Sequence, residues 1–184
     1  MFFIKKILGV INQSLLRFFN CKIKFKGIGL IPFNSHFNIR KGIFSGGRKF
    51  IMANNSEIRC YGKLDIGHNF CLNSYSRIMA HEKISIGNNV TIAQFVCILD
   101  HDHKYKFINN ELKLGGYTTS PIKIGNNVWI ADKVTILKGV TIGDNVIIGA
   151  NSLVNKDVQS NSIVGGVPAK LIKLIDEKNT ISRS

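Results

Sequence analysis

Aliphatic residues recur every six positions through the second half of the chain. Between Ile122 and Ile172 the spacing is kept by Ile124, Ile130, Ile136, Ile142, Ile148 and Val154. A valine stands four positions after each of the first four, and a glycine or another small or polar residue follows most of them directly. No helix has a period of six residues, and no single strand keeps such spacing for so long. The repeat therefore indicates stacked units that bury their apolar side only against neighbouring units.

A six-residue unit can form one flat side of a three-sided coil. The aliphatic residue points into the coil, and the residue beside it lies at a corner, where Gly or Asn tolerates a positive φ. Three units complete one coil, and stacked coils form three parallel sheets around an aliphatic core. The pattern predicts an all-β solenoid of this kind.

The first half of the chain follows the pattern less regularly. Residues 21–65 show strand-like alternation and are interpreted as degenerate early coils, with Ile58, Leu64 and Ile66 pointing inward. The six-residue spacing then holds in two sets, Ile66, Leu72, Ile78 and Ile86, Ile92, Ile98. A slip of two residues near His81-Glu82 separates the sets.

The repeat stops at Leu99 and resumes near Ile122. The intervening segment, at about 99–121, is too long for a corner and carries two of the five histidines, His101 and His103. A long excursion from a rigid solenoid is usually functional, so the segment is predicted to be a protruding loop with a role in the active site.

Three stretches of the sequence indicate which protein family the chain resembles. The run CILDH, the segment from SPIKIGNNVWI to SLVNKDV, and the ending GGVPAKLI resemble bacterial galactoside, maltose and O-antigen sugar O-acetyltransferases of the hexapeptide-repeat family. The resemblance covers about residues 60–173 and is strongest from Ser120 to Ile172. It implies a left-handed parallel β-helix, a homotrimer with each site between two chains, and direct transfer of an acetyl group from acetyl-CoA to a sugar hydroxyl. The implied acceptor belongs to a surface polysaccharide or its precursor.

This chemistry requires one general base, and no metal or protein nucleophile. A histidine with a pKa near ~6.5 can take the proton of the hydroxyl and return it to the departing thiolate. By the resemblance this base is His101, and His103 binds or orients the acceptor. Asp100 and Asp102 could fix the imidazole tautomer, although a solvated loop charge is the favoured interpretation of both.

His36, His68 and His81 are interpreted as surface residues. His81 stands where the relatives carry an acidic acceptor-binding residue, so the resemblance fails there and does not identify the sugar. Asn73 matches an acceptor-side asparagine of the family, on a corner where Asn also has a structural reason to be. Trp129, the only tryptophan, is expected near the acceptor or over the trimer seam.

The resemblance also implies a groove for CoA. Its predicted contacts are Asp132, Ala150, Asn155, Lys156, Lys170 and Lys173. Ala150 is small, as a groove wall requires. Lys170 and Lys173 replace arginines that hold phosphates in the relatives, and they keep the charge without the bidentate fork. Taken singly, each lysine fits a solubilising surface equally well.

The whole chain, residues 1–184, is expected to form a single acyltransferase domain. Residues 1–20 are predicted to form an amphipathic helix, residues 21–168 the β-helix, and residues 169–184 a short C-terminal helix with a tail. Packing against the protein is the favoured role of the N-terminal helix, and the alternative is peripheral contact with a membrane surface. The protein is accordingly placed in the cytoplasm, at the inner face of the cytoplasmic membrane under that alternative.

A formal net charge of +14 invites an anionic partner. No nucleic-acid motif accompanies it, so nucleic acid is not expected. Four cysteines without metal-ligand spacing are interpreted as reduced and inert. Two alternatives stay open, an N-acyltransferase acting on an amino-sugar nucleotide and a non-catalytic β-helix that serves as a scaffold or holds a metal. The metal version would need a third histidine beside His101 and His103.

Overall fold

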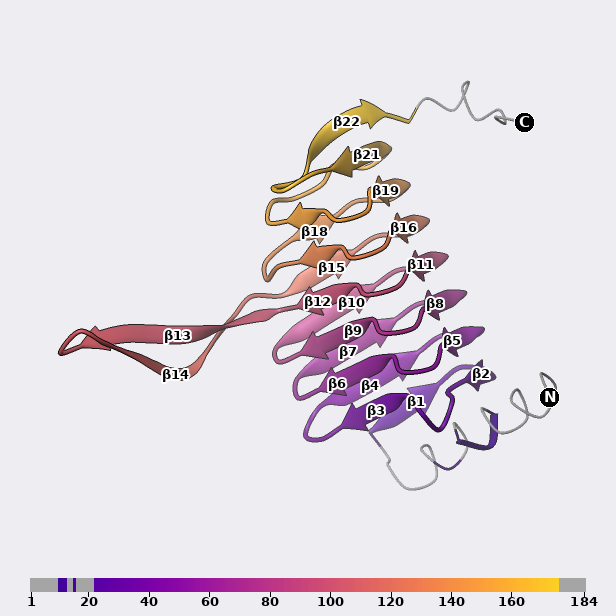
Figure 1. Cartoon of the computed structure of the whole chain (residues 1–184). Helices are drawn as coiled ribbons and strands as arrows, with labels where there is room; N and C mark the ends of the chain where they lie inside the picture. Colours follow the sequence, from indigo (N-terminus) through magenta and orange to yellow (C-terminus); the bar gives the residue numbers. More distant parts are fainter. Residues whose placement is uncertain (1–9, 13–14, 16–21, 176–184) are drawn as a thin grey trace.

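The computed structural model describes residues 10–12, 15 and 22–175 and shows a β-solenoid of three parallel sheets (Figure 1). Sheet A contains β1 (Ile23–Phe25), β4 (Ile43–Gly46), β7 (Lys63–Ile66), β10 (Lys83–Ile86), β15 (Ile122–Ile124) and β18 (Thr141–Ile142). Sheet B contains β2 (Gly29–Leu30), β5 (Phe50–Met52), β8 (Phe70–Leu72), β11 (Val90–Ile92), β16 (Val128–Ile130), β19 (Val146–Ile148), β21 (Ser162–Gly165) and β22 (Lys170–Leu174). Sheet C contains β3 (His36–Ile39), β6 (Glu57–Cys60), β9 (Arg77–Ala80), β12 (Cys97–Leu99), β17 (Thr135–Ile136) and β20 (Leu153–Val154).

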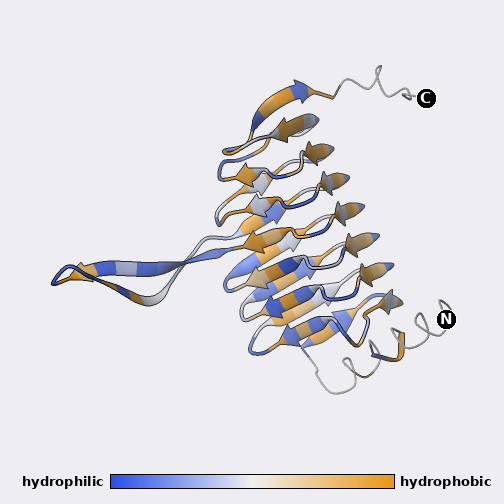
Figure 2. Ribbon diagram, viewed as in Figure 1, coloured by the Kyte–Doolittle hydropathy of each residue, from blue (hydrophilic) through white to orange (hydrophobic). Residues whose placement is uncertain are grey.

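The chain passes from sheet A to B to C and back to A, so each coil turns three times. These turns are named corner AB, corner BC and corner CA. The parallel strands bury alternate side chains in the solenoid and leave the others at least partly exposed. The banded ribbons of Figure 2 show the matching alternation of hydrophobic and hydrophilic residues. The predicted inward positions are confirmed, because Ile58, Leu64 and Ile66 are buried, as are the aliphatic residues of the hexapeptide repeat.

Coil length changes along the solenoid. Asn69 and the equivalent Asn89 of the next coil are separated by 20 positions, whereas Asn127 and Asn145 are separated by 18. The shorter coil is three hexapeptides. The longer coil holds two extra residues at corner CA, which confirms the slip predicted near His81-Glu82.

Phenylalanine fills the core of the first coils, which explains why the aliphatic repeat is obscured there. The rings of Phe44 and Phe50 lie 5.0 and 5.3 Å from that of Phe25, centroid to centroid. Gly46 occupies the place that Ile66 takes in the next coil. A Cβ at Gly46 would lie 2.8 Å from Phe25 Cδ1, so the missing side chain makes room for the ring.

A ladder of asparagine side chains supports corner AB. Each amide nitrogen donates to the amide oxygen of the asparagine in the next coil, over 2.8 to 3.1 Å. The ladder runs through Asn69, Asn89, Asn127, Asn145 and Asn161, all of which have φ between 54° and 58°. Asn tolerates this left-handed conformation better than most residues do. The prediction placed the positive φ on the residue directly after the inward aliphatic residue, and this is wrong, because Gly125 and Gly143 lack a positive φ whereas Asn127 and Asn145, two positions further on, have it.

The excursion predicted as a loop is an antiparallel β-ribbon. Strands β13 (His101–Ile108) and β14 (Glu111–Thr119) pair from His101↔Thr119 to Ile108↔Glu111. Asn109 and Asn110 connect them, both with positive φ, as a two-residue hairpin turn requires. The ribbon leaves the solenoid at corner CA and projects far from it (Figure 1).

The predicted C-terminal helix is wrong for the residues that the structure describes. Residues 170–174 form β22, which pairs antiparallel with β21. The edge of sheet B offers unpaired backbone groups at this point, and pairing with them outweighs the helical tendency of a short apolar segment. Residues 176–184 lie outside the described part of the chain.

Most of the predicted N-terminal helix also lies outside the described residues, which include only 10–12 and 15 of its range. The Asn12 amide donates to the Ile31 carbonyl over 2.9 Å, so this part of the chain contacts the first coil. Where the structure is described, no helix is long and apolar enough to cross a bilayer.

Candidate active site

Two histidine rings stack at corner CA, and a tilted tyrosine ring contacts one of them. Tyr61, His81 and His101 follow β6, β9 and β12 at equal intervals in the sequence, so they occupy equivalent places in successive coils. The ring centroids of His81 and His101 lie 3.7 Å apart, with the planes inclined by 17°. The ring of Tyr61 lies 4.6 Å from that of His81, on its other side. The stack therefore presents His101 at the root of the ribbon.

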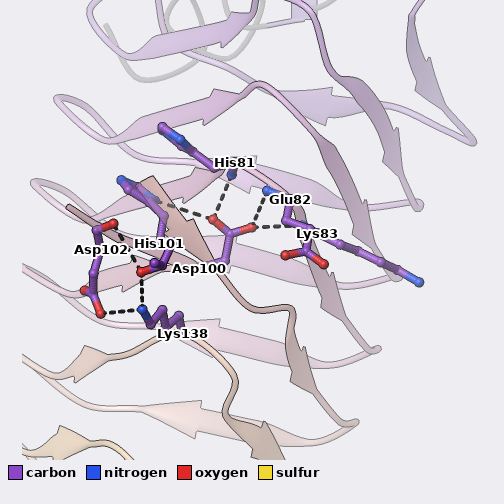
Figure 3. Close-up of polar contacts among 8 residues, drawn as sticks. His81, Glu82, Lys83, Asp100, His101, Asp102 and Lys138 are labelled. Atoms are coloured by element: carbon purple, nitrogen blue, oxygen red, sulfur yellow. Dashed lines mark hydrogen bonds and ion pairs between the residues drawn. The ribbon is translucent and has the colours of Figure 1, made fainter. Parts of the chain in front are cut away.

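Asp100 is the structural centre of this corner. Its side chain has no exposed surface, and its carboxylate accepts hydrogen bonds from the backbone N–H groups of His81, Glu82 and Lys83 over 2.7, 2.8 and 2.9 Å (Figure 3). A buried carboxylate is stable only when its oxygens are paired in this way. The interpretation of Asp100 as a solvated loop charge is therefore wrong.

His101 is almost buried, with 9% of its surface exposed. Its Nδ1 atom lies 3.4 Å from Asp100 Oδ1, is fully buried and has no hydrogen-bond partner among the described residues. The other ring nitrogen, Nε2, is not fully buried, and no hydrogen bond joins it to another described residue. One nitrogen thus faces a carboxylate, and the other is available to a ligand.

Tyr117, on β14, covers this stack. Its ring stands nearly perpendicular to that of His101, with centroids 5.3 Å apart, and lies 4.6 Å from the rings of both His81 and His103. His103 is exposed on β13 and contacts Tyr117 in the described structure. The acceptor role predicted for His103 thus remains a prediction.

Lys138 ties the ribbon to the next coil. Its ammonium lies 3.0 Å from Asp102 Oδ2 and also donates to Thr118 Oγ1, so it contacts both strands of the ribbon (Figure 3). Asp102 is half exposed, in agreement with a solvated loop charge, but it has this specific partner. Lys138 was not among the residues predicted for the site.

The interpretation of His81 as a plain surface residue is also wrong, since its ring lies between those of Tyr61 and His101. Tyr61, His81 and His101 are equally spaced in the sequence, and the spacing is one coil that includes the two extra residues of the slip. Had every coil in this part of the chain been given this length, the sequence would have predicted that the three side chains are neighbours. His36 and His68 are exposed, as expected.

Burial lowers the pKa of His81 below 6.5, and repulsion from His101 lowers it further, although Asp100 acts in the opposite direction. Neutral His81 therefore contributes stability above the unfolded pKa, and the contribution is lost as the pH falls through the lower folded pKa. We expect an NMR titration to give a lower pKa for His81 in the folded protein than in urea, and His101→Ala to raise the folded value. A His81 that titrates at or above its unfolded value would contradict this.

Apart from His103, the residues predicted to bind CoA or the acceptor lie away from His101 within one chain. Asn73, Asp132 and Ala150 are at corner BC, at the other end of the sheet C strands. Trp129, Lys170 and Lys173 are exposed on sheet B, on the side of the solenoid away from corner CA. Asn155 and Lys156 share corner CA with His101, two coils further on.

Two of these residues have contacts that account for them structurally. The Asn73 amide donates to the Ile92 carbonyl over 2.8 Å, and Asp132 Oδ1 accepts from the Gln94 backbone N–H over 2.8 Å. Trp129 lines an open cavity of about 410 Å³ together with Asn89, Thr91 and Asn127. Ala150 is exposed, so a groove passing over it is open to solvent in the single chain.

The buried Cys60 thiol stays protonated and is therefore unreactive. Burial, with a contribution from the Asp100 charge, raises the pKa of Cys60 to about 11. Cys60, Cys71 and Cys97 are free thiols, in agreement with the expected reduced state, and Cys21 lies outside the described residues. No three His, Cys, Asp or Glu side chains in the described part of the chain are arranged to hold a metal ion.

Comparison with known proteins gives the family. The model of the bacterial transferase hexapeptide (six repeats) matches residues 121–156. The crystal structure of a maltose O-acetyltransferase from Clostridium difficile 630 superposes with a TM-score of 0.62 at 33% identity, covering 83% of this chain and 71% of that chain. The chain belongs to the hexapeptide-repeat acetyltransferase family. A galactoside acetyltransferase solved in complex with coenzyme A superposes with a TM-score of 0.60 at 30% identity, covering 88% of this chain and 69% of that one.

Curated relatives match over shorter stretches. Galactoside O-acetyltransferase of Escherichia coli K12 is 48% identical over 73 residues, which are 39% of this chain and 36% of that protein. A putative lipopolysaccharide biosynthesis O-acetyl transferase, WbbJ, of the same strain is 46% identical over 55 residues, 30% of this chain and 28% of that protein. The matched stretches thus span about a third of the length of these relatives.

Proposed function

We propose that the protein transfers an acetyl group from acetyl-CoA to a sugar hydroxyl, with His101 as general base. The observation that carries the proposal is the asymmetry of the imidazole, whose Nδ1 faces the buried Asp100 carboxylate while Nε2 is not fully buried and has no hydrogen bond to another described residue. A general base needs one free nitrogen and benefits from an orienting partner on the other. Coenzyme A in the galactoside acetyltransferase structure supports the choice of donor.

The acetyl group passes directly from the sulfur of CoA to the oxygen of the sugar. Nε2 accepts the hydroxyl proton as the sugar oxygen attacks the thioester carbonyl carbon, and the Asp100 carboxylate stabilises the imidazolium that forms. Collapse of the tetrahedral intermediate breaks the carbon–sulfur bond, and the imidazolium returns the proton to the thiolate. The products are an acetylated sugar and CoA with a free thiol. The similarity to a maltose O-acetyltransferase and to WbbJ, a putative lipopolysaccharide biosynthesis O-acetyl transferase, supports a sugar of a surface polysaccharide or its precursor as the acceptor.

The distribution of the predicted residues supports a site shared by two chains. Asn73, Asp132 and Ala150 are separated from His101 by the length of the sheet C strands, so one chain does not bring them together. In a homotrimer, corner CA of one chain would face corner BC of the next. The CoA arm would then pass Ala150, and Lys170 and Lys173 would hold its phosphates.

Calorimetric titration of acetyl-CoA tests this proposal without knowledge of the acceptor. We expect saturable binding that is weaker for ATP at the same ionic strength, because ATP has no pantetheine arm. Ala150→Trp should abolish the binding by filling the groove, while Ala93→Trp, at the same corner two coils away, should preserve it. Binding that is indifferent to Ala150→Trp would contradict the groove, and no binding at all would favour a non-catalytic scaffold.

A further inference from the structure

The positive charge of the molecule is concentrated at its N-terminal end. Residues 1–56 contain ten Lys and Arg and no Asp or Glu, and the first acidic residue is Glu57. These ten account for most of the formal net charge of +14, because the other Lys and Arg share residues 57–184 with all 11 Asp and Glu. Coils one and two, residues 22–60, therefore carry most of the uncompensated charge that the structure describes.

Three of these basic side chains line one cavity. An open cavity of about 560 Å³ lies at corner AB of the first coils, lined by Lys26, Arg48, Lys49, His68, Asn69 and Asn89. No ion pair between described residues involves Lys26, Arg48 or Lys49. Their side chains are exposed, and Lys49 stands where the asparagine ladder ends below Asn69. The cavity has the size and charge to receive a phosphate group.

Large apolar side chains are exposed on the same two coils. Ile28, Phe33 and Ile43 have 72%, 58% and 53% of their surface exposed, one at or beside each of the three corners. Ile28 lies next to the cavity, because a Cβ at the adjacent Gly27 would be 2.9 Å from Arg48 Cγ. Of the three, only Ile28 lies at the corner of the cavity. A soluble polyanion gives no reason for an exposed Ile28 beside the cations, whereas a lipid surface accepts both an apolar tip and cations.

We propose that coils one and two dock on a bilayer that contains anionic phospholipids. Lys26, Arg48 and Lys49 bind lipid phosphates at corner AB, and Ile28 enters the interface beside them. The contact is made by the solenoid itself and is thus distinct from any contact made by residues 1–20. It is independent of acetyl transfer, and it would hold the enzyme near an acceptor carried on a lipid.

Vesicle co-sedimentation of the full chain tests the proposal. We expect binding to phosphatidylcholine vesicles that contain phosphatidylglycerol, little binding to phosphatidylcholine alone, and a decrease of binding with salt. Arg48→Glu with Lys49→Glu should weaken the partition at least about thirtyfold, since each basic residue at an anionic surface contributes roughly fivefold. Ile28→Asp should weaken it further.

The matched control is Lys123→Glu with Lys133→Glu, which changes the net charge equally. Lys133 has φ 58°, close to the 54° of Lys49, so the backbone cost of the two changes is alike. The control should bind almost as well as the unaltered protein. Equal loss in both variants, unaltered binding in both, or binding that ignores phosphatidylglycerol would overturn the proposal. Displacement by soluble pyrophosphate at equal ionic strength would instead assign the cavity to a free phosphate ligand, and displacement by DNA would assign it to nucleic acid.

Discussion

His101→Ala should reduce the turnover number for acetyl transfer by about 10²- to 10⁴-fold, the usual contribution of a general base. Without the imidazole, the sugar hydroxyl must lose its proton to water while it attacks the thioester. The affinity for acetyl-CoA should stay almost unchanged, because the residues predicted to bind CoA lie on other parts of the solenoid. Initial rates of CoA thiol release, with the best acceptor found by screening, provide the measurement.

An exposed histidine, His36, serves as the matched control for this result, and His103 tests the acceptor side of the site. His36→Ala, on the exposed face of β3, should leave turnover within about twofold of the unaltered enzyme, as surface substitutions usually do. His103→Ala should raise the Michaelis constant for the acceptor more than it lowers turnover, if His103 orients the sugar as predicted. Full turnover in His101→Ala would place the base elsewhere, and loss of acetyl-CoA affinity would indicate a damaged fold instead.

The solenoid was predictable because its inward-facing residues recur at a short and regular interval. Each inward aliphatic residue faces the equivalent residue of the next coil, so one misplaced polar side chain would be buried without a partner, and the period persists. In the first coils phenylalanine and Gly46 fill the same space together. A pattern that considers one position at a time does not detect this compensation.

The sequence of the ribbon also contains a pattern that predicts its structure, although a search for six-residue units overlooks it. Tyr105 and Phe107 alternate with lysines on one strand, and Leu112 and Leu114 do so on the other, around an Asn109-Asn110 turn. Alternation of period two on both sides of such a turn predicts a hairpin. The register pairs Tyr105 with Leu114 and Phe107 with Leu112, so these four residues share one face.

The prediction that Asp100 is a solvated loop charge was wrong because its position in the coil, and not the polarity of the neighbouring sequence, determines whether it is buried. The segment DHDHKYK is polar and reads as a solvated loop. In the coil, however, Asp100 takes the place that Ala80 occupies one coil earlier, and there backbone N–H groups donate hydrogen bonds to its carboxylate. The side chain at corner CA must be small, and three donors from the neighbouring coil converge on it.

Asp100→Ala is expected to have the largest effect on stability of any polar substitution at the site. It leaves three partly buried backbone N–H groups, those of His81, Glu82 and Lys83, without their acceptor. Each such group costs about 1–3 kcal/mol, so the free energy of unfolding should fall by about 3–5 kcal/mol. Urea denaturation checks the value. Asp65→Ala is the matched control, because the half-exposed Asp65 pairs with Lys63 at the surface and should contribute less than about 1 kcal/mol.

Asp100→Asn separates the structural role of this carboxylate from its role in catalysis. The asparagine can keep one acceptor oxygen, but its NH₂ group faces the donors that Asp100 Oδ2 serves, and it cannot stabilise an imidazolium at His101. Turnover should therefore fall even at temperatures where the variant remains folded. In a double-mutant cycle with His101→Ala, the two losses should be far from additive, because Asp100 acts on the reaction through His101. Additive losses would show that Asp100 supports the corner without helping the base. An Asp100→Ala variant as stable as Asp65→Ala would refute the structural role of Asp100 as well.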